Sequence, residues 1–294
     1  MYKEVAFDPQ CLCEFHYYAL LKSQFGFEHG RYVVAPLKPW VQEAVKSIKG
    51  SSLSPVKQKS IKTYLNRLQR TKQDNPCILL PKDRASVTKA VQDWLGWVES
   101  QQRHRQFNSV VSERPVNCAI DYEQILLPAE QWNVPPSLLV DKTKQDIVKA
   151  VSPLIHLSSG LTIVDQYFSI SNNPVLKGLI EQLQNHQQIG SLTLVTSVKP
   201  ADPHKVFQHE FVNQFAYLPA FKLIIAPERY FHDRYMITDV ATIKAGHGFS
   251  TGVAKGGQSD KLSLSLCGKA ESDLTLDFVN KLAQDRPEQV YQLN

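Results

Sequence analysis

Cysteine is scarce in this sequence, and it does not occur in paired motifs. The 294 residues include five cysteines, an odd number scattered between Cys11 and Cys267, with no CxxC pair among them. Neither a disulfide framework nor a zinc site is therefore indicated. We expect reduced thiols, as in a cytoplasmic protein, and no metal ion or other cofactor.

Long apolar runs and targeting signals are missing as well. A membrane-spanning helix needs about 18 or more consecutive apolar residues, and the sequence has no such window. The segment MYKEVAFDPQ has acidic residues early and no basic stretch before an apolar run, unlike a secretory signal. We therefore expect a cytoplasmic protein with no membrane span.

A strong charge imbalance is also absent. Hydrophobic residues make up 43% of the chain and charged residues 21%, which is typical of a globular protein and excludes a disordered one. The formal charge of +5 suits a polyanionic partner but does not require one. The length of the chain favours two domains.

The first half of the chain is predicted to be mainly helical. Apolar residues recur at helical spacing in KQKSIKTYLNRLQRTKQ (57–73) and in SVTKAVQDWLGWVESQQRHRQ (86–106). Basic side chains on these helices indicate nucleic-acid binding, because phosphate contacts supply most non-specific affinity, although such charges can also serve only to solvate a helix. The candidate nucleic-acid-binding residues are Lys57, Lys59, Lys62, Arg67, Arg70, Arg103 and Arg105.

A proline-containing stretch separates this half from the next. The segment LLPAEQWNVPPSLL (126–139) predicts a linker or an irregular segment, and a helix is expected in DKTKQDIVKAVSPL (141–154). We place the domain boundary near residue 157, within about ten residues. The first domain, 1–157, would bind substrate or a partner protein, and the second is 158–294.

From Leu161 the sequence alternates between strands and helices. Strands and helices alternate up to the third strand, short strands then follow in succession, and a helix closes the chain, which indicates an α/β fold with parallel strands joined by crossover helices. Loops at the carboxyl ends of such strands meet at one edge of the sheet, where we expect a site. The predicted strands are 161–165, 191–197, 221–226, 234–239, 242–246 and 262–267, and the helices are 173–186, 202–216 and 272–283.

One segment at that edge carries a recognisable motif. In ERYFHDRYMITDVATIKAGHGFSTG, His232 is followed by Arg234, Asp239 and Gly246. This spacing resembles the H-x-K-x4-D motif of the phospholipase D superfamily, in which a G-S-x-N element follows the aspartate at the same interval. The resemblance extends from Leu161 to the chain end. It implies a phospholipase-D-like mixed sheet with flanking helices.

The resemblance implies metal-independent phosphodiester chemistry through a phosphohistidine intermediate. Side chains alternate along a strand, so His232 as nucleophile and Arg234 as phosphate clamp would share one face. By resemblance, Asp239 would accept a hydrogen bond from a histidine and fix its orientation. Because the chain holds one motif copy, the resemblance also implies a homodimer with a composite active site, in which the second His232 is the general acid.

The motif departs from the family pattern at three positions. Arg234 replaces lysine, which keeps the charge and adds bidentate geometry, while His247 and Phe249 replace serine and asparagine. HDR followed by IKAGHGF is also similar to the phospholipase-D-like C-terminal domain attached to microtubule-interacting-and-trafficking domains. Those domains bind phosphorylated ligands such as phosphoinositides without an established hydrolytic role.

Further candidates follow the predicted strands at the same edge. Asp165 and Tyr167 come after the first strand and Lys199 after the second, although an acid at that position is as often a turn former, and a loop lysine is often only solvated. The candidate substrate-binding residues are Asp165, Tyr167, Lys199, Gly246, His247 and Ser250.

The leading interpretation is a phosphodiesterase of phospholipase D type that acts on nucleic acid, with a role in bacterial antiviral defence as a conjecture. The alternatives are a non-catalytic adaptor that recognises phosphate on a lipid or nucleic acid, and a DNA-binding protein with a degenerate scaffold.

Overall fold

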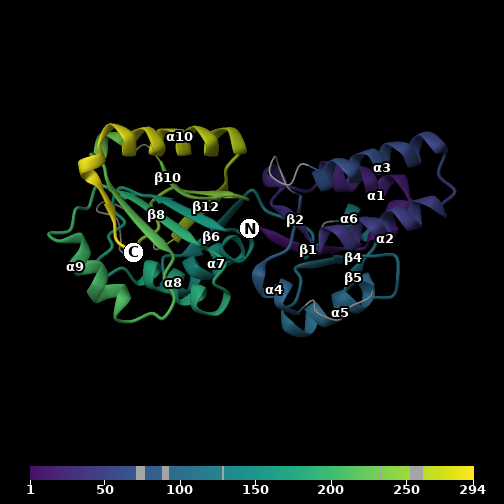
Figure 1. Cartoon of the computed structure of the whole chain (residues 1–294), viewed down its shortest axis with the longest axis horizontal. Helices are drawn as coiled ribbons and strands as arrows, with labels where there is room; N and C mark the ends of the chain where they lie inside the picture. Colours follow the sequence, from purple (N-terminus) through teal and green to yellow (C-terminus); the bar gives the residue numbers. More distant parts are fainter. Residues whose placement is uncertain (71–76, 88–92, 128, 232, 252–260) are drawn as a thin grey trace. The chain divides into compact units, whose positions relative to one another are not determined.

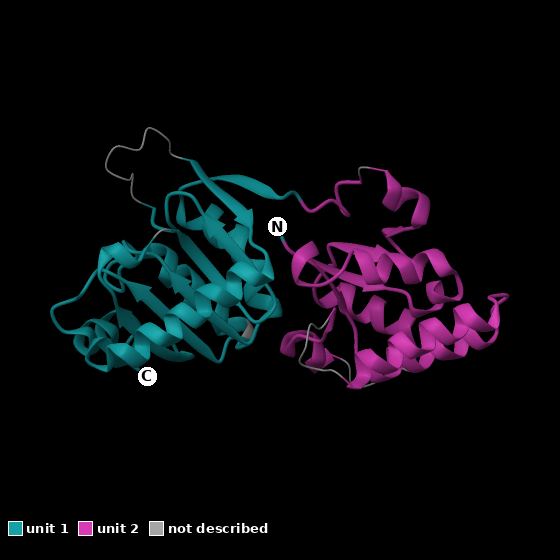
Figure 2. Ribbon diagram, turned by 90° about the horizontal axis from the view of Figure 1, so that it is seen from above, with its two compact units in different colours: residues 1, 135–294 teal, residues 2–134 magenta. Residues whose placement is uncertain are grey.

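The chain folds into two compact units. The computed structural model describes residues 1–70, 77–87, 93–127, 129–231, 233–251 and 261–294. The N-terminal unit comprises residues 2–134, and the C-terminal unit comprises residue 1 and residues 135–294 (Figure 2). The boundary expected near residue 157 is therefore too late. Strand β6 (Ser137–Asp141) and helix α7 (Lys144–Leu157) precede that position, and β6 already pairs within the C-terminal sheet.

A five-stranded parallel sheet forms the centre of the N-terminal unit, with the order β3-β2-β1-β4-β5. Helices hold more residues of this unit than strands do, as expected, but the parallel sheet was not predicted. The strands are short and largely buried, so they lack the alternation of polar and apolar residues that reveals a half-exposed strand. They are β1 (Lys3–Phe7), β2 (Arg31–Val34), β3 (Ile78–Leu79), β4 (Ser109–Val111) and β5 (Ala119–Ile120).

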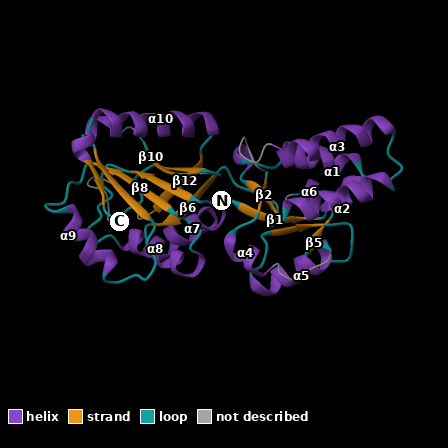
Figure 3. Ribbon diagram, viewed as in Figure 1, coloured by secondary structure: helices purple, strands orange, loops and turns teal. Residues whose placement is uncertain are grey.

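Helices cover both faces of this sheet. Helices α1, α2 and α3 lie on one face and α4 and α5 on the other (Figures 1 and 3). The helix expected at 57–73 is confirmed up to Arg70 as α3, which buries Ile61 and Leu65, and residues 71–73 lie outside the described residues. Of the helix expected at 86–106, residues 94–104 are confirmed as α5, and residues 88–92 lie outside the described residues. The Asp93 side chain caps α5 by accepting a hydrogen bond from the Gly96 N–H at 2.9 Å. The helices are α1 (Phe15–Ser23), α2 (Leu37–Lys49), α3 (Pro55–Arg70), α4 (Lys82–Val87), α5 (Trp94–His104) and α6 (Tyr122–Leu126).

The C-terminal unit is built on an eight-stranded mixed sheet with the order β13-β9-β8-β7-β10-β11-β12-β6. Strands β7, β8 and β9 are parallel, and the other pairs are antiparallel. The six strands and three helices expected from Leu161 onward are confirmed as β7 to α10, whereas β6 and β13 were not predicted. The remaining strands are β7 (Gly160–Val164), β8 (Ser191–Thr196), β9 (Ala220–Ile225), β10 (Arg234–Thr238), β11 (Thr242–Ala245), β12 (Lys261–Leu266) and β13 (Val290–Gln292).

Helix α10 (Lys269–Asp285) lies along one face of this sheet (Figures 1 and 3). Helices α7 and α8 (Pro174–His186) lie on the other face, and α9 (Pro203–Phe207) lies beside them. The core under α10 includes Val164, Tyr235 and Ile237. Because side chains alternate along a strand, Arg234 is directed to the opposite face of β10 from Tyr235. Among the described residues of both units, no helix is long and apolar enough to cross a membrane.

The strand register brings three segments to one edge of the C-terminal sheet. Val164 at the end of β7 pairs with Tyr235 near the start of β10, and Arg234 pairs with Ala245 at the end of β11. Asp165, Arg234 and the loop after β11 therefore meet at one edge, which we call the Arg234 edge. Thr238 pairs with Leu161, so the end of β10 lies at the opposite edge.

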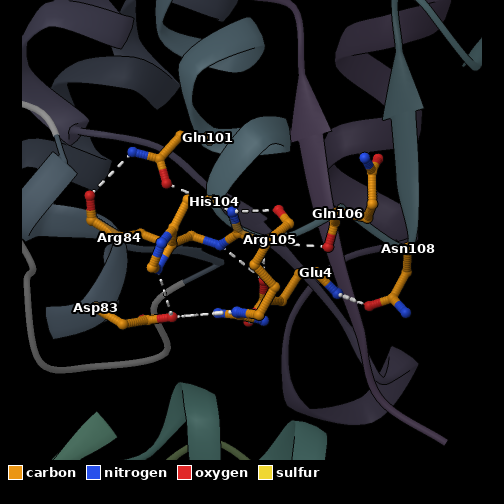
Figure 4. A network of polar contacts seen from close by, with 8 residues as sticks. All are labelled: Glu4, Asp83, Arg84, Gln101, His104, Arg105, Gln106 and Asn108. Atoms are coloured by element: carbon orange, nitrogen blue, oxygen red, sulfur yellow. Dashed lines mark hydrogen bonds and ion pairs between the residues drawn. The ribbon is translucent and has the colours of Figure 1, made fainter. Parts of the chain in front are cut away.

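A buried ion-pair network ties β1 to helices α4 and α5 in the N-terminal unit (Figure 4). The fully buried Arg84 donates to Glu4 Oε2 from Nε at 2.8 Å and from Nη2 at 2.6 Å. Arg105 donates to Glu4 Oε1 at 2.8 Å and to Asp83 Oδ2 at 2.9 Å. The Arg84 guanidinium also lies 4.0 Å from the centre of the Phe107 ring. The two arginines and the two carboxylates of this network thus neutralise one another inside the unit.

Arg84→Met is expected to lower the free energy of unfolding by about 3 kcal/mol, because it leaves the buried Glu4 carboxylate with only part of its compensation. Urea denaturation followed by circular dichroism measures the loss. The matched control is Arg103→Met at an exposed position of α5, which should change stability by less than about 0.5 kcal/mol. Equal effects of the two substitutions would contradict the structural role of the network.

Candidate functional site

The Arg234 edge gathers most of the residues expected to bind substrate. Asp165 directly follows β7, Arg234 begins β10, and Gly246 and His247 follow β11. Tyr167 lies in the loop after β7 and is 57% exposed, and Lys199 lies exposed in the loop after the parallel strand β8. Residues far apart in the sequence thus converge because β7 and β8 are parallel and β10 runs antiparallel to β7.

Arg234 has an unsatisfied donor at the centre of this edge. Its side chain is half-buried, and its buried Nε has no hydrogen-bond acceptor among the described residues. Leaving a buried donor unpaired costs about 1–3 kcal/mol, and more when the group is charged. The guanidinium therefore has unused capacity for an acceptor from outside the described part of the chain, and its fork geometry matches two oxygens of an anion.

Asp165 forms the turn beside Arg234 and does not face solvent. The side chain is 1% exposed, and its Oδ1 accepts the Tyr167 N–H at 3.0 Å while Oδ2 accepts the Phe249 N–H at 2.8 Å. Burial raises the pKa of Asp165, and the two N–H donors and the positive charge of Arg234 offset part of that rise. Of the two roles open for Asp165, the structure thus supports turn formation over direct ligand contact.

The loop after β11 depends on Gly248, which the motif analysis missed. Gly248 has a φ of +79°, and a Cβ there would lie 2.7 Å from Asp165 Oδ2. At Gly246, by contrast, a Cβ would meet nothing within 4 Å. The sequence signal that could have indicated this close approach of the backbone to Asp165 is the second glycine of the Gly-His-Gly segment 246–248. Phe249 is fully buried, His247 is exposed and Ser250 is half-buried, so the loop presents His247 at the edge.

Asp239 directly follows β10, at the opposite end of this strand from Arg234. Its carboxylate accepts hydrogen bonds from the Ser159 N–H and Ser159 Oγ, both at 2.9 Å. A strand rises by about 3.3 Å per residue, so the five residues of β10 put roughly 16 Å between Arg234 and Asp239. Asp239 joins the end of β10 to the start of β7, and its expected role in orienting a histidine stays a prediction. His232 lies outside the described residues.

A polar cluster holds the start of β10 from the α10 side. Lys244 Nζ lies 3.0 Å from Asp233 Oδ2 and 3.1 Å from Glu271 Oε1, and the Tyr235 hydroxyl donates to Glu271 at 2.8 Å. The hydrogen bonds to Asp233 and Glu271 raise the pKa of Lys244. Asp233, which directly precedes Arg234, is therefore anchored to β11 and, through Lys244, to α10. This favours a fixed position for the backbone of Arg234.

The expected basic surface of the N-terminal unit is present on α3. This helix of 16 residues contains no acidic side chain. Its candidate residues Lys57, Lys59, Arg67 and Arg70 are exposed and Lys62 is half-buried, and Arg103 is exposed on α5.

Arg105 is a correction to the predicted nucleic-acid-binding set. Its side chain is 24% exposed and forms ion pairs with Glu4 and Asp83. Its charge therefore belongs to the internal network and is not available to a phosphate backbone.

No model of a known protein family matches the sequence, and a search of curated proteins also finds no match. The functional argument consequently depends on the motif spacing and on the geometry of the Arg234 edge.

Gly248→Ala is expected to destabilise the loop, because the new Cβ would clash with the Asp165 carboxylate and alanine disfavours a positive φ by about 1–2 kcal/mol. Gly246→Ala is the matched control and should have a small effect. Hydrogen–deuterium exchange of the segment after β11 and urea unfolding measure the difference. A larger effect at Gly246 would contradict the assignment of the constraint to Gly248.

Asp165→Asn is expected to destabilise the protein by about 1–3 kcal/mol, because asparagine offers one acceptor oxygen to two backbone N–H groups. Since the pKa of Asp165 is raised, its carboxyl contributes most below the unfolded-state pKa, and this contribution falls as pH rises through the raised value. The difference between parent and variant in urea unfolding should therefore shrink from acidic to neutral pH. A difference that grows with pH would refute this assignment.

Proposed function

We propose that this chain recognises phosphate groups of nucleic acid, and that Arg234 binds a phosphate at the edge of the C-terminal sheet. The observation that carries the proposal is the buried Arg234 Nε, which has no acceptor among the described residues. An anionic oxygen would complete its hydrogen bonding and neutralise its charge, and charge-assisted contacts of this kind are about twice as strong as neutral ones.

The surroundings of Arg234 support a fixed anion site. Asp165 holds the loop after β11 through the Phe249 N–H, and the cluster around Lys244 anchors the neighbouring Asp233. The guanidinium would therefore meet a ligand with little reorganisation, which favours affinity. Exposed Tyr167 at the same edge offers a ring on which a base can stack.

Nucleic acid is preferred as the source of the phosphate because of helix α3. Five basic side chains and no acidic one on a single helix suit a phosphate backbone, which binds through several such contacts. Each unit then contributes independently to the same class of ligand. The phosphoinositide recognition implied by the second resemblance is the rival outcome of the binding test.

Metal-independent hydrolysis is the second candidate function. His247 favours hydrolysis because this exposed residue lies close to Arg234 along the sheet. Ala245 pairs with Arg234, and His247 follows Ala245 by two residues. A phosphodiesterase needs a general acid for the leaving oxygen, and an imidazole at this edge suits that role. The nucleophilic role of His232 and the cytoplasmic homodimer with a composite site stay predictions.

Arg234→Gln is expected to weaken binding of fluorescein-labelled single-stranded DNA about tenfold, since it removes a charged donor. Fluorescence anisotropy at several salt concentrations measures it, and each lost phosphate contact should lower the slope of log affinity against log salt by about 0.7. Arg234→Lys should restore part of the affinity. The control is Lys281→Gln at an exposed position of α10. Parent-like binding by Arg234→Gln would refute the phosphate site, and preference for phosphoinositide vesicles over DNA would refute the nucleic-acid assignment.

Cleavage is tested with the same DNA in the presence of EDTA. If the chain is a phosphodiesterase, the parent should cut the strand, while His232→Ala and His247→Ala should each slow cutting by at least about 100-fold, the usual contribution of a general acid or base. Binding without cutting by the parent supports phosphate recognition alone. Cutting that survives His232→Ala would overturn the phosphohistidine mechanism.

A further inference from the structure

A large pocket opens at the carboxyl edge of the parallel sheet in the N-terminal unit. Its volume is about 1070 Å³, and its walls come from the segment after β1, from α2 and the loop behind it, from the start of α5 and from Arg114 beyond β4. The chain leaves β1 toward β2 on one side, whereas it reaches β4 on the other side through α4 and α5. Open α/β sheets bind ligands where the direction of winding reverses in this way.

A buried carboxylate behind the pocket wall holds Arg114 in place. Asp8 follows β1, is 0% exposed, and accepts hydrogen bonds from Arg114 Nε at 2.7 Å and Arg114 Nη2 at 2.8 Å. Ser112 Oγ donates to the same carboxylate at 2.7 Å. The Arg114 guanidinium also lies 5.2 Å from the centre of the Trp94 ring. Asp8 thus neutralises the charge of Arg114 and fixes its place in the wall.

Two buried indole groups in the pocket wall lack acceptors. Trp94 and Trp97 are 4% and 3% exposed and occupy one face of α5, being three residues apart. Neither Nε1–H has an acceptor among the described residues, whereas the indole of Trp40 in the same wall donates to the Phe7 carbonyl at 2.6 Å. A buried donor without a partner is rare in a native protein and calls for an acceptor from water, an ion or a ligand.

The charge of the wall restricts the ligand. Glu14, Glu43 and Asp93 line the pocket together with Lys46 and Arg114. Arg114 forms ion pairs with both Asp8 and Glu43, so with Asp8 behind the wall four carboxylates stand against two cations. An excess of carboxylates repels a phosphate and accepts hydrogen bonds from hydroxyl groups. A simple cation would satisfy the carboxylates but could not accept from the indoles. The ligand must therefore carry both hydroxyl donors and acceptor atoms, without a negative charge.

We propose that this pocket binds an uncharged ligand with a polyhydroxylated ring, either a free sugar or the ribose portion of a nucleoside. The hydroxyls donate to the carboxylates of the wall, and ring or base acceptors take up the indole N–H groups of α5. The site is independent of the phosphate site, since it lies within the other unit and selects against phosphate.

Isothermal titration of the full chain tests this assignment with adenosine, uridine, ribose and glucose, and with AMP and glucose 6-phosphate as charged counterparts. At least one uncharged compound should bind saturably, and its phosphate should bind at least about tenfold more weakly because of the carboxylates. Binding of nucleosides alone or of free sugars alone identifies the source. No saturable heat with any uncharged compound, or tighter binding of a phosphorylated one, would overturn the proposal.

Two substitutions test the named groups with the compound that binds. Trp94→Phe keeps an aromatic ring but removes the N–H, and it should weaken binding about fivefold. Trp132→Phe is the control, because Trp132 is the one of the four tryptophans outside the pocket wall. Glu14→Gln should narrow the preference for the uncharged form over its phosphate, whereas Glu99→Gln on the exposed face of α5 should not. Unchanged affinity in Trp94→Phe together with unchanged preference in Glu14→Gln would refute the assignment.

Discussion

The arrangement of the Arg234 edge depends on one buried carboxylate that is shared between two backbone segments. Asp165 accepts one N–H from its own turn and another from the loop after β11, so a single side chain fixes both relative to β7. The two donors and the positive charge of Arg234 offset part of the cost of burying this acid. The same arrangement requires a glycine at position 248, because any side chain there would displace the carboxylate. Asp165, the loop after β11 and Arg234 are therefore positioned together.

The two units differ in the charge that lies at the carboxyl ends of their parallel strands. In the C-terminal unit, antiparallel β10 and β11 bring a charged donor to the carboxyl end of a parallel strand. In the N-terminal unit, the corresponding edge is parallel throughout, and the buried Asp8–Arg114 pair removes the charge that an anion would need. If both proposals hold, one edge would attract phosphate and the other would disfavour it.

Local patterns in the sequence predicted the elements that have strong periodicity. Helices α3 and α7 and the order from β7 to α10 follow from apolar spacing, from runs such as LTLV and from flanking turn residues. The parallel sheet of the N-terminal unit was missed, because β3 and β5 are two residues long and their stability comes from neighbours distant in sequence. The Asp8–Arg114 pair joins residues 106 positions apart, and no local signal marks it. The contact of Asp239 with Ser159 likewise joins residues 80 positions apart, and no local signal marks it.

The N-terminal unit contains charges of two kinds: the buried network of Glu4, Arg84 and Arg105, and the exposed basic side chains of α3. Charges that are sealed from water feel little screening by dissolved ions, whereas the lysines and arginines along α3 stand within the ionic atmosphere. If a polyanion binds along α3 as proposed, raising the ionic strength should release it while the fold that presents these side chains persists. Dissociation by salt can therefore serve as a gentle and reversible elution step, with the protein recovered in its native state.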